Sequence, residues 1–307
     1  TDRVFFNKKI KKIVADLVKY EYHTNVNIIH AHTWYSDGAV AYELFKRYDI
    51  PYIITIRNTD LNLFNKYALH LRQIGVNILE NASKIIFISG IYKKRFFNLF
   101  DKDSYREKSV IIPNGINDFW NENIENRKSK LSGIPELLFV GRFTKGKNVA
   151  RLIKAVENLN KDGTHCKLNL VGGGGTKEQK IINLSKNLDF VKYHGKVFDK
   201  KKLKELYIKS DIYTMPSKRE TFGLVYVEAL SQGIPVVFAE NEGIDGFYNN
   251  IGEAVNCFDV DSIAKGIKKI IENYNCYSFK PKEIIKNHNW SEIAKTYSSI
   301  YNNIINQ

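Results

Sequence analysis

The stretch PSKRETFGLVYVEAL, residues 216–230, tells more about the fold and the chemistry than any other part of the chain. An apolar run at residues 211–215 comes directly before it and predicts a strand, and a helix is expected to begin where the stretch turns apolar. A helix that opens just after a strand offers unpaired backbone N–H groups to an anion. Glu220 and Glu228 lie on either side of this junction, and Glu228 is expected about five residues into the helix, roughly 7 Å along its axis. A ligand with a phosphate at the helix start and hydroxyl groups on either side would fit both carboxylates.

Apolar runs and helical segments alternate around this stretch. Strands are predicted at residues 137–140, 167–171, 191–194, 212–215 and 236–239, with helices at 148–160 and from the glycine run to about residue 187. The first half alternates in the same way, with strands predicted at 27–31, 52–56, 85–88 and 110–112 and helices at 1–22, 36–48 and about 61–81. Continuous apolar strands separated by helices indicate parallel sheets with both faces covered.

The predicted fold class is therefore α/β, with two Rossmann-like doubly wound domains that face a cleft. Polar residues at 121–134, rich in Asn and Lys, are expected to link an N-terminal domain, residues 1–120, to a C-terminal domain, residues 135–289. The amphipathic segment 290–307 is expected to pack back on the first domain. Because the chain opens on a basic helix, we expect the N-terminal domain to lack its first strand or strands.

Composition narrows the class of protein. The chain has 307 residues, of which 43% are hydrophobic, and no apolar run approaches the ~20 residues that cross a bilayer. No signal peptide is visible, and the three cysteines have neither metal nor disulfide spacing, which fits a reducing compartment. The net charge of +14 reflects either an AT-rich genome or attraction to anions, such as nucleotide phosphates or an anionic membrane face. No zinc finger, helix-turn-helix or aromatic RNA-binding pattern supports a nucleic-acid partner.

Further polar or glycine-rich stretches follow predicted strands, where ligands bind in doubly wound sheets. Arg142 and Lys147 lie five residues apart after the strand at 137–140 and suit phosphate oxygens, although a solvated basic loop also explains them. The four glycines at 172–175 either let the backbone approach a ligand or form a flexible turn. Residues 194–197, HGKV, follow another short strand, where the backbone could meet a nucleotide base. For the two glutamates of the opening stretch, the alternative is one glutamate favoured by the helix dipole and one that is solvated.

Residues 137–240 resemble the nucleotide-sugar half of a GT-B glycosyltransferase and are most similar to glycosyltransferase family 4. The stretches that carry the resemblance are LLFVGRFTKGKN, NLVGGGG, YHGKV and PSKRETFGLVYVEALSQGIPVV. The last of these contains the specific pattern of that family, two glutamates separated by seven residues. The weaker stretches NIIHAHTW, TIRNTD, KIIFISGIYKKRF and VIIPNGIND extend the resemblance over nearly the whole chain. One departure is the run of four glycines, where the family has a VGxGP-like turn.

The resemblance implies a role for each matching residue of the C-terminal domain. Arg142 and Lys147 would neutralise the diphosphate leaving group of a nucleotide sugar. Glu220 would hold hydroxyl groups of the transferred sugar, and Glu228 would bind the ribose hydroxyls. Backbone N–H groups around Phe222, Gly223 and Leu224 would meet the sugar and phosphate, and Gly172, Gly173, Gly195, Lys196 and Val197 would lie near the base. Gly141 and Thr221 are further donor-binding positions.

In the N-terminal domain, the resemblance makes His32 a cleft-facing histidine close to the reacting sugar, whereas the residues alone also allow a packing histidine at a strand end. Asn58, Thr59 and Asp60 are assigned to the acceptor side, and residues 114–115 to the hinge side of the cleft.

The implied activity is that of a retaining hexosyltransferase. It would move a sugar from a UDP- or GDP-sugar to a glycan or lipid-linked acceptor, in the synthesis of cell-surface polysaccharides or glycoconjugates. No cofactor or metal is expected, because cationic side chains can stabilise the leaving group. Asp259-Val260-Asp261 has the form of a metal-binding DxD triplet, but the helical segment after it favours a helix cap.

Two other functions stay open from the sequence. A nucleotide-sugar epimerase has the same fold and needs acid and base groups inside the cleft, and a non-catalytic partner protein could keep a transferase-like fold. The expected location is the cytoplasm, with peripheral attachment to the inner face of the plasma membrane as an option. A basic N-terminal helix suits an anionic membrane, although a solvated helix face explains the same residues. Its lysines are Lys8, Lys9, Lys11, Lys12 and Lys19.

Overall fold

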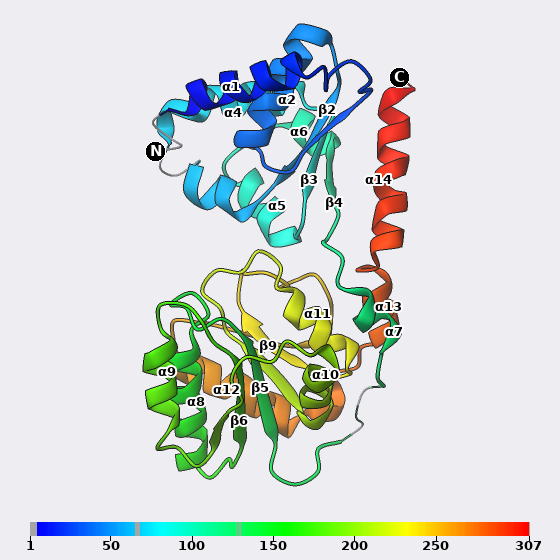
Figure 1. Cartoon of the computed structure of the whole chain (residues 1–307). Helices are drawn as coiled ribbons and strands as arrows, with labels where there is room; N and C mark the ends of the chain where they lie inside the picture. Colours follow the sequence, from blue (N-terminus) through cyan, green and yellow to red (C-terminus); the bar gives the residue numbers. More distant parts are fainter. Residues whose placement is uncertain (1–4, 65–67, 127, 129, 307) are drawn as a thin grey trace. The chain divides into compact units, whose positions relative to one another are not determined.

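The computed structural model describes residues 5–64, 68–126, 128 and 130–306. It divides into two compact units (Figure 1). Unit 1 comprises Thr1–Pro113 together with Ile293–Gln307, and unit 2 comprises Asn114–Glu292. The C-terminal segment thus belongs to the same unit as the N-terminal half of the chain. No helix in the described ranges is both long and apolar enough to cross a bilayer.

Unit 1 contains a four-stranded parallel sheet in the order β1-β2-β3-β4. Its strands are β1 (Ile29–Ala31), β2 (Tyr52–Ile56), β3 (Lys84–Phe87) and β4 (Ser109–Ile111). Every residue of β2 is buried, as expected for a strand with covered faces. The helical segments are α1 (Phe6–Lys19), α2 (Ser36–Tyr48), η1 (Asp60–Phe64), η2 (Leu69–Leu71), α4 (Arg72–Asn81), α5 (Gly90–Phe97), α6 (Asp103–Glu107) and α14 (Trp290–Ile305).

Helix α14 packs on the sheet of unit 1, alongside β4 in Figure 1. Ile293 joins a buried cluster with Ile53 and Ile86 of the sheet. The hydroxyl of Tyr301 lies 2.7 Å from Nδ1 of His30, the middle residue of β1. The last helix therefore covers one face of the sheet, and α1 and α2 pack against each other elsewhere in the unit.

The long helix predicted at about 61–81 is wrong. The described backbone forms the π-helix η1, then a 3-10 turn, and only then the α-helix α4. Ala68 is buried with φ −109° and ψ 59°, values that no α-helix allows, so the chain cannot run through as one helix. Residues 65–67, which this prediction also covered, lie outside the described residues.

The linker predicted at 121–134 is also placed differently by the structure. The chain passes from unit 1 to unit 2 between Pro113 and Asn114, and α7 (Asp118–Glu122) already belongs to unit 2. Trp120 explains this boundary, because its buried indole packs edge-on against Tyr207 with ring centroids 5.4 Å apart. The Trp120 side chain therefore anchors the polar helix α7 to α10 (Lys200–Lys209) of unit 2.

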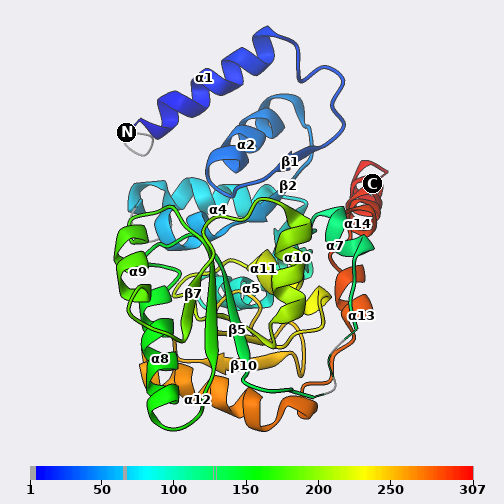
Figure 2. The same ribbon diagram turned by 60° about the horizontal axis from the view of Figure 1, so that its bottom comes forward.

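Unit 2 is a six-stranded parallel sheet in the order β10-β9-β8-β5-β6-β7. Helices α8, α9 and α12 lie on one side of it and α10 and α11 on the other (Figures 1 and 2). The strands are β5 (Glu136–Gly141), β6 (Lys167–Gly172), β7 (Val191–Tyr193), β8 (Ile212–Met215), β9 (Val236–Ala239) and β10 (Gly252–Val255). The remaining helical segments are α8 (Val149–Lys161), α9 (Glu178–Ser185), α10 (Lys200–Lys209), α11 (Leu224–Ser231), α12 (Val260–Glu272), η3 (Tyr274–Cys276) and α13 (Pro281–Lys286).

The strand order of unit 2 reverses between β5 and β8. From β5 the chain continues outward through β6 and β7, whereas from β8 it continues through β9 and β10 in the opposite direction. Such a reversal separates the loops at the carboxyl ends of the two central strands, and ligands of doubly wound sheets bind there. The loops that follow β5 and β8 are residues 142–148 and 216–223.

The ends of β5 and β6 approach so closely that a glycine is required. Gly172 pairs in register with Gly141 and has φ +124°, and a Cβ built on it would lie 2.0 Å from the Gly141 carbonyl oxygen. Beyond the strands, the N–H of Phe143 donates to the carbonyl of Gly174 at 2.9 Å. The glycine run therefore joins the loop after β6 to the loop after β5.

The two segments that lead into and out of unit 2 are fastened to each other. The imidazole of the buried His288 donates from Nδ1 to the Asn114 carbonyl at 2.7 Å, and its Nε2 accepts from the Tyr248 hydroxyl at 3.0 Å. The N–H of Ile116 donates to the His288 carbonyl at 2.9 Å. Gly115 lies directly against the indole of Trp290, since a Cβ there would be 2.5 Å from the ring.

Replacing Gly172 with alanine should destabilise the protein strongly. The matched control is Gly163→Ala, because Gly163 also has a positive φ, +83°, but has open space around its Cα. We expect Gly163→Ala to cost about 1 kcal/mol from backbone strain alone. Gly172→Ala adds a clash with the Gly141 carbonyl and should cost at least about 3 kcal/mol. Urea unfolding measures the loss of unfolding free energy in each variant. Equal losses in Gly172→Ala and Gly163→Ala would show that the ends of β5 and β6 can move apart to accept the added methyl group.

The stability of the protein should fall as pH falls below neutrality. Burial lowers the pKa of His288 from 6.5 to about 4, against the opposing effect of its bond to the Asn114 carbonyl. Between pH 6.5 and 4, His288 is therefore protonated in the unfolded state but still neutral in the folded state, and this difference favours unfolding. The free energy of unfolding should fall by about 3 kcal/mol over this range. Urea unfolding between pH 7 and 4 should show a smaller pH slope for His288→Gln than for the wild type. The exposed His165→Gln is the control, and a wild-type slope in both variants would contradict this role.

Candidate functional site

The loops after β5 and β8 meet through a charged pair. Lys147, in the first loop, forms a salt bridge from Nζ to Oε2 of Glu220 in the second loop. The same ammonium lies 3.5 Å from the sulfur of Met215 at the end of β8. The Lys147 side chain is 26% exposed and that of Glu220 is 15% exposed, so the pair is partly desolvated but open to a ligand.

Arg142 shares the first loop with Lys147 but differs in its surroundings. Its side chain is exposed, and it forms no ion pair with any residue that the structure describes. The guanidinium therefore keeps its donors for a ligand, and a planar fork of donors suits phosphate oxygens. Lys147 and Arg142 together bring two positive charges to the reversal point of the sheet.

Glu242 holds the backbone of Glu220 in place. A carboxylate oxygen of Glu242 accepts from the N–H of Glu220 at 2.9 Å, and the carbonyl of Glu220 accepts from the N–H of Gly243 at 2.8 Å. Gly243 must be a glycine here, because φ is +55° and a Cβ would lie 2.7 Å from the Phe222 carbonyl. Sequence reasoning missed Glu242, which lies 22 residues from its partner in a segment without a motif.

The start of α11 leaves backbone donors open. Gly223 precedes the helix with φ +84°, a left-handed conformation that favours glycine. In the described part of the chain, no acceptor receives the N–H groups of Phe222, Gly223 or Leu224. Phe222 anchors this turn, because its buried ring packs against Phe247 and His288 with centroids 5.0 Å away in each case. Thr221, half-buried before it, completes the turn.

Glu228 lies in the fifth position of α11, as the sequence predicted. One of its carboxylate oxygens accepts from the Tyr207 hydroxyl at 3.1 Å. Burial raises the pKa of Glu228, and the Tyr207 bond and the charge of Lys200 oppose that shift. Tyr207 was not predicted as a site residue, because only the folded chain brings α10 beside α11.

The predicted glycines gather at the carboxyl ends of β5, β6 and β7. Gly172 donates its N–H to the carbonyl of Gly195 at 2.7 Å, so the loop after β7 joins the tie between β5 and β6. Lys196 extends along the glycine run, where a Cβ on Gly173 would lie 3.3 Å from its Cε. Val197 is half-buried beside it.

Asn148 is a further residue that sequence reasoning did not single out. Its buried amide donates to the carbonyls of Pro216 at 3.1 Å and Cys257 at 2.6 Å. The first of these bonds joins the loop of Lys147 to the loop of Glu220. A left-handed φ of +62° at Asn148 is a conformation that asparagine tolerates well, and its place directly after Lys147 was the available signal.

In unit 1, His32 is exposed directly after β1. Its ring lies against that of His30, with centroids 4.2 Å apart, and its carbonyl accepts from Nε of Arg57 at 3.2 Å. Burial, together with the charges of His32 and Arg57, lowers the pKa of His30 to about 4. His30 is thus the packed histidine of this motif and His32 the accessible one.

The three residues assigned to the acceptor side differ in accessibility. Thr59 is exposed, and Asn58 is half-buried with its side-chain oxygen bonded to Asn62. Asp60 is 1% exposed and accepts from the backbone N–H groups of Trp34 at 3.2 Å and Arg57 at 2.8 Å. Asp60 therefore fastens the loop after β1, and the expectation that it lines an acceptor site is not supported.

The Asp259-Val260-Asp261 triplet is a helix cap, as predicted. The carboxylate of Asp259 accepts from the N–H of Asp261 at 3.0 Å at the start of α12. Among the described residues, no cluster of three or more His, Cys, Asp or Glu side chains could hold a metal ion.

Comparison with known proteins places this architecture in a family. The family Glycosyl transferases group 1 matches residues 121–297, more than half of the chain, and Glycosyltransferase Family 4 matches residues 3–118. An uncharacterized glycosyltransferase of Methanocaldococcus jannaschii is 26% identical over 305 residues, with 90% of this chain and 75% of that protein covered.

Solved structures show the same fold. Sucrose-phosphate synthase from Thermosynechococcus elongatus superposes with a TM-score of 0.74 at 22% identity, over 99% of this chain and 79% of that one. HepE of Anabaena, solved in complex with UDP and glucose, gives a TM-score of 0.66 at 19% identity, over 94% and 80% of the two chains. With both units matched by family and fold, the chain belongs to the group 1 glycosyl transferases and has their GT-B fold.

Proposed function

We propose that this glycosyltransferase takes its sugar from a nucleoside diphosphate sugar and transfers it with retention to a glycan or lipid-linked acceptor. The observation that carries the proposal is the arrangement at the β5–β8 reversal. Lys147 and Glu220 are paired there, Arg142 extends from the same loop as Lys147, and the first N–H groups of α11 have no described acceptor. A hexose is the proposed sugar, and cell-surface polysaccharide or glycoconjugate synthesis is the proposed setting.

Leaving-group stabilisation is the proposed source of catalysis. When the bond between the sugar and the diphosphate breaks, negative charge gathers on the diphosphate. Arg142 and Lys147 share a loop that is tied to the glycine run, and the α11 start adds backbone donors. Groups fixed in advance for a developing charge lower the barrier without reorganisation. Cationic side chains in this role make a metal unnecessary in the proposed mechanism.

The two glutamates are proposed to bind hydroxyl groups. Glu220, held at its backbone by Glu242, would accept from hydroxyls of the transferred sugar. Glu228, partly buried and bonded to Tyr207, would accept from the ribose hydroxyls. The glycine run and the loop at 195–197 would lie along the base, which we propose to be uracil or guanine. The complex of HepE with UDP and glucose supports UDP as the first donor nucleotide to test.

The acceptor is proposed to attack from the face that the diphosphate leaves, which gives retention without a carboxylate nucleophile. For His32 we propose a place beside the reacting sugar, because its imidazole is the exposed one of the motif. Thr59 and Asn58 remain proposed acceptor-side residues. An epimerase of the same fold would need acid and base groups at the sugar, and a partner protein would turn over no donor.

We also propose a cytoplasmic location with attachment to an anionic membrane face. The lysines of α1 are exposed, while Phe6, Ile10 and Val14 of the same helix are buried in the core of unit 1. The apolar face of α1 is thus used inside the protein. Attraction to a membrane would come from the lysines, with the exposed side chains of Phe5, Ile13 and Tyr20 beside them, and its electrostatic part would depend on salt.

Removing either cation should abolish most transfer. We expect Arg142→Ala and Lys147→Ala each to lower kcat/KM by about 10²–10³-fold, because each removes charge stabilisation from the transition state. The control is Lys154→Ala, an exposed lysine of α8 that pairs with Glu157 away from the loop. Transfer of labelled sugar from a panel of UDP- and GDP-hexoses measures the effect, and circular dichroism checks the fold. Wild-type turnover in both loop variants would refute the phosphate role.

Glu228→Gln should weaken the binding of free UDP or GDP by about tenfold, the loss of one charged hydrogen-bond acceptor. The preference among donor sugars should not change, because Glu228 is proposed to touch the ribose and not the transferred sugar. Titration calorimetry measures nucleotide affinity, and competition between labelled donors measures sugar preference. An altered sugar preference with unchanged nucleotide affinity would contradict this assignment.

A further inference from the structure

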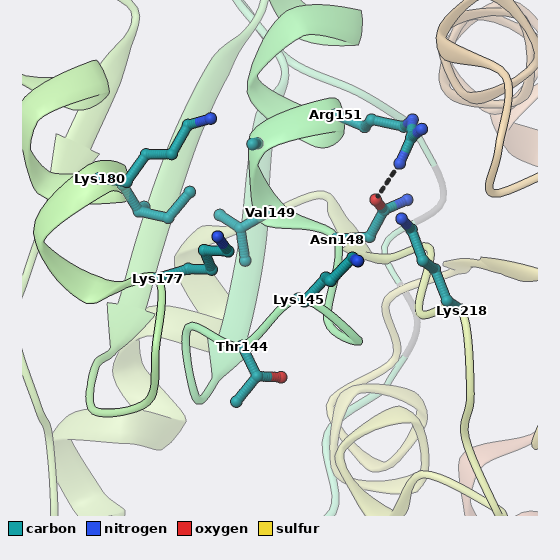
Figure 3. Close-up of a pocket in the computed structure, with 10 residues that line it drawn as sticks. Thr144, Lys145, Asn148, Val149, Arg151, Lys177, Lys180 and Lys218 are labelled. Atoms are coloured by element: carbon teal, nitrogen blue, oxygen red, sulfur yellow. Dashed lines mark hydrogen bonds between the residues drawn. The ribbon is translucent and has the colours of Figure 1, made fainter.

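A second basic pocket lies outside the proposed donor-binding residues. It is a small cavity of about 120 Å³ between the first turns of α8 and α9, closed by parts of the loops after β5 and β8 (Figure 3). Arg142, Lys147 and Glu220 are not among its lining residues. The lining residues are Thr144, Lys145, Asn148, Val149, Ala150, Arg151, Lys177, Lys180, Ile181 and Lys218.

Five of the lining side chains are cations, and none is a carboxylate. Lys177 and Lys180 come from the α9 side, and Lys145, Arg151 and Lys218 come from the other side of the pocket (Figure 3). None of the four lysines forms an ion pair with a residue in the described ranges. Elsewhere on α8 the pattern differs, because Lys154 and Lys161 both pair with Glu157.

The start of α8 adds backbone donors to the same pocket. The side chain of Asn148 does not cap the helix, because its amide donates to Pro216 and Cys257. Its side-chain oxygen instead accepts from Arg151 at 3.1 Å. The N–H groups of Val149 and Ala150, which line the pocket, therefore have no acceptor among the described residues.

Like charges around one cavity repel each other, and the repulsion is largest where water is partly excluded. Burial and the charges of Arg151 and Lys145 lower the pKa of Lys218, which agrees with this crowding. An anion in the cavity would remove the repulsion. It would also receive the free backbone donors of a helix start, where anions bind favourably.

We propose that this pocket binds a phosphate group, as a monoester, a diester or inorganic phosphate, at a site separate from that of the donor. Arginine and lysine together with open N–H groups are the donor set that phosphate oxygens require. The exposed ring of Phe258 lies 5.5 Å from the Lys218 ammonium at this side of unit 2. An exposed aromatic ring beside cations also suits the headgroup of an anionic lipid, so free and lipid-borne phosphate must be compared.

The test is titration of the full chain with inorganic phosphate, without any nucleotide. The pocket variant is Lys177→Gln with Lys180→Gln, and its matched control is Lys154→Gln with Lys161→Gln, which removes the same charge from outside the pocket. We expect the pocket variant to bind phosphate at least about tenfold more weakly than the control does, the effect of losing one charge-assisted hydrogen bond or more. Arg142→Ala should keep this pocket-dependent binding, because Arg142 does not line the pocket.

Vesicles of phosphatidylcholine, with and without phosphatidylglycerol, identify the source of the phosphate. Sedimentation with the anionic vesicles that is lost in the pocket variant would assign the site to a lipid headgroup. Sedimentation that is equal in both variants, with pocket-dependent binding of free phosphate, would assign it to a soluble compound. Phosphate affinity and vesicle binding that are the same in the pocket variant and its control would overturn the proposal. If Arg142→Ala alone abolished phosphate binding, the pocket would be excluded while the donor-site assignment stood.

Discussion

The pairing of β5 with β8 is the constraint on which the site depends. Leu137 and Leu138 pair with Ile212 and Tyr213 in one parallel sheet, although some 75 residues separate them along the chain. Because both strands run in the same direction, their following loops emerge at the same edge. This shared edge brings Lys147 and Glu220 together. The side-chain amide of Asn148 also joins the two loops by a hydrogen bond to the Pro216 carbonyl. This neutral bond lies one residue after Lys147 and helps to hold the charged pair in place.

The sequence correctly predicted those helices and strands whose formation depends mainly on residues close to one another in the chain. The predicted helix at 36–48 and the predicted strand at 52–56 have the bounds of α2 and β2, since a short, mostly apolar run and a helical segment between two such runs leave few alternatives. The interruption before α4 and the burial of Trp120 were not foreseen. Both depend on contacts with residues far away in the sequence, which the spacing of apolar residues along the chain cannot reveal. Glu242, Tyr207 and Asp60 show the same limit at the site, because their hydrogen-bond partners are found only in the folded chain.

The positive charge of the chain is distributed in physically different ways. On α8, lysines pair with Glu157 at the surface, where such pairs contribute little to stability. At the β5–β8 edge, one lysine is matched to one carboxylate and an arginine stays exposed. In the pocket beside α8 and α9, cations accumulate without any acidic side chain. A net charge of +14 therefore says less about ligands than the local balance at each of these places does.

The fastening of Asn114 and Ile116 to His288 has a structural consequence. The polypeptide enters and leaves unit 2 at these two segments, and two hydrogen bonds join them to each other. Phe222 of the turn before α11 packs on the imidazole of His288, with ring centroids 5.0 Å apart. One buried histidine side chain therefore contacts both the segment by which the chain enters unit 2 and the turn whose backbone N–H groups are open.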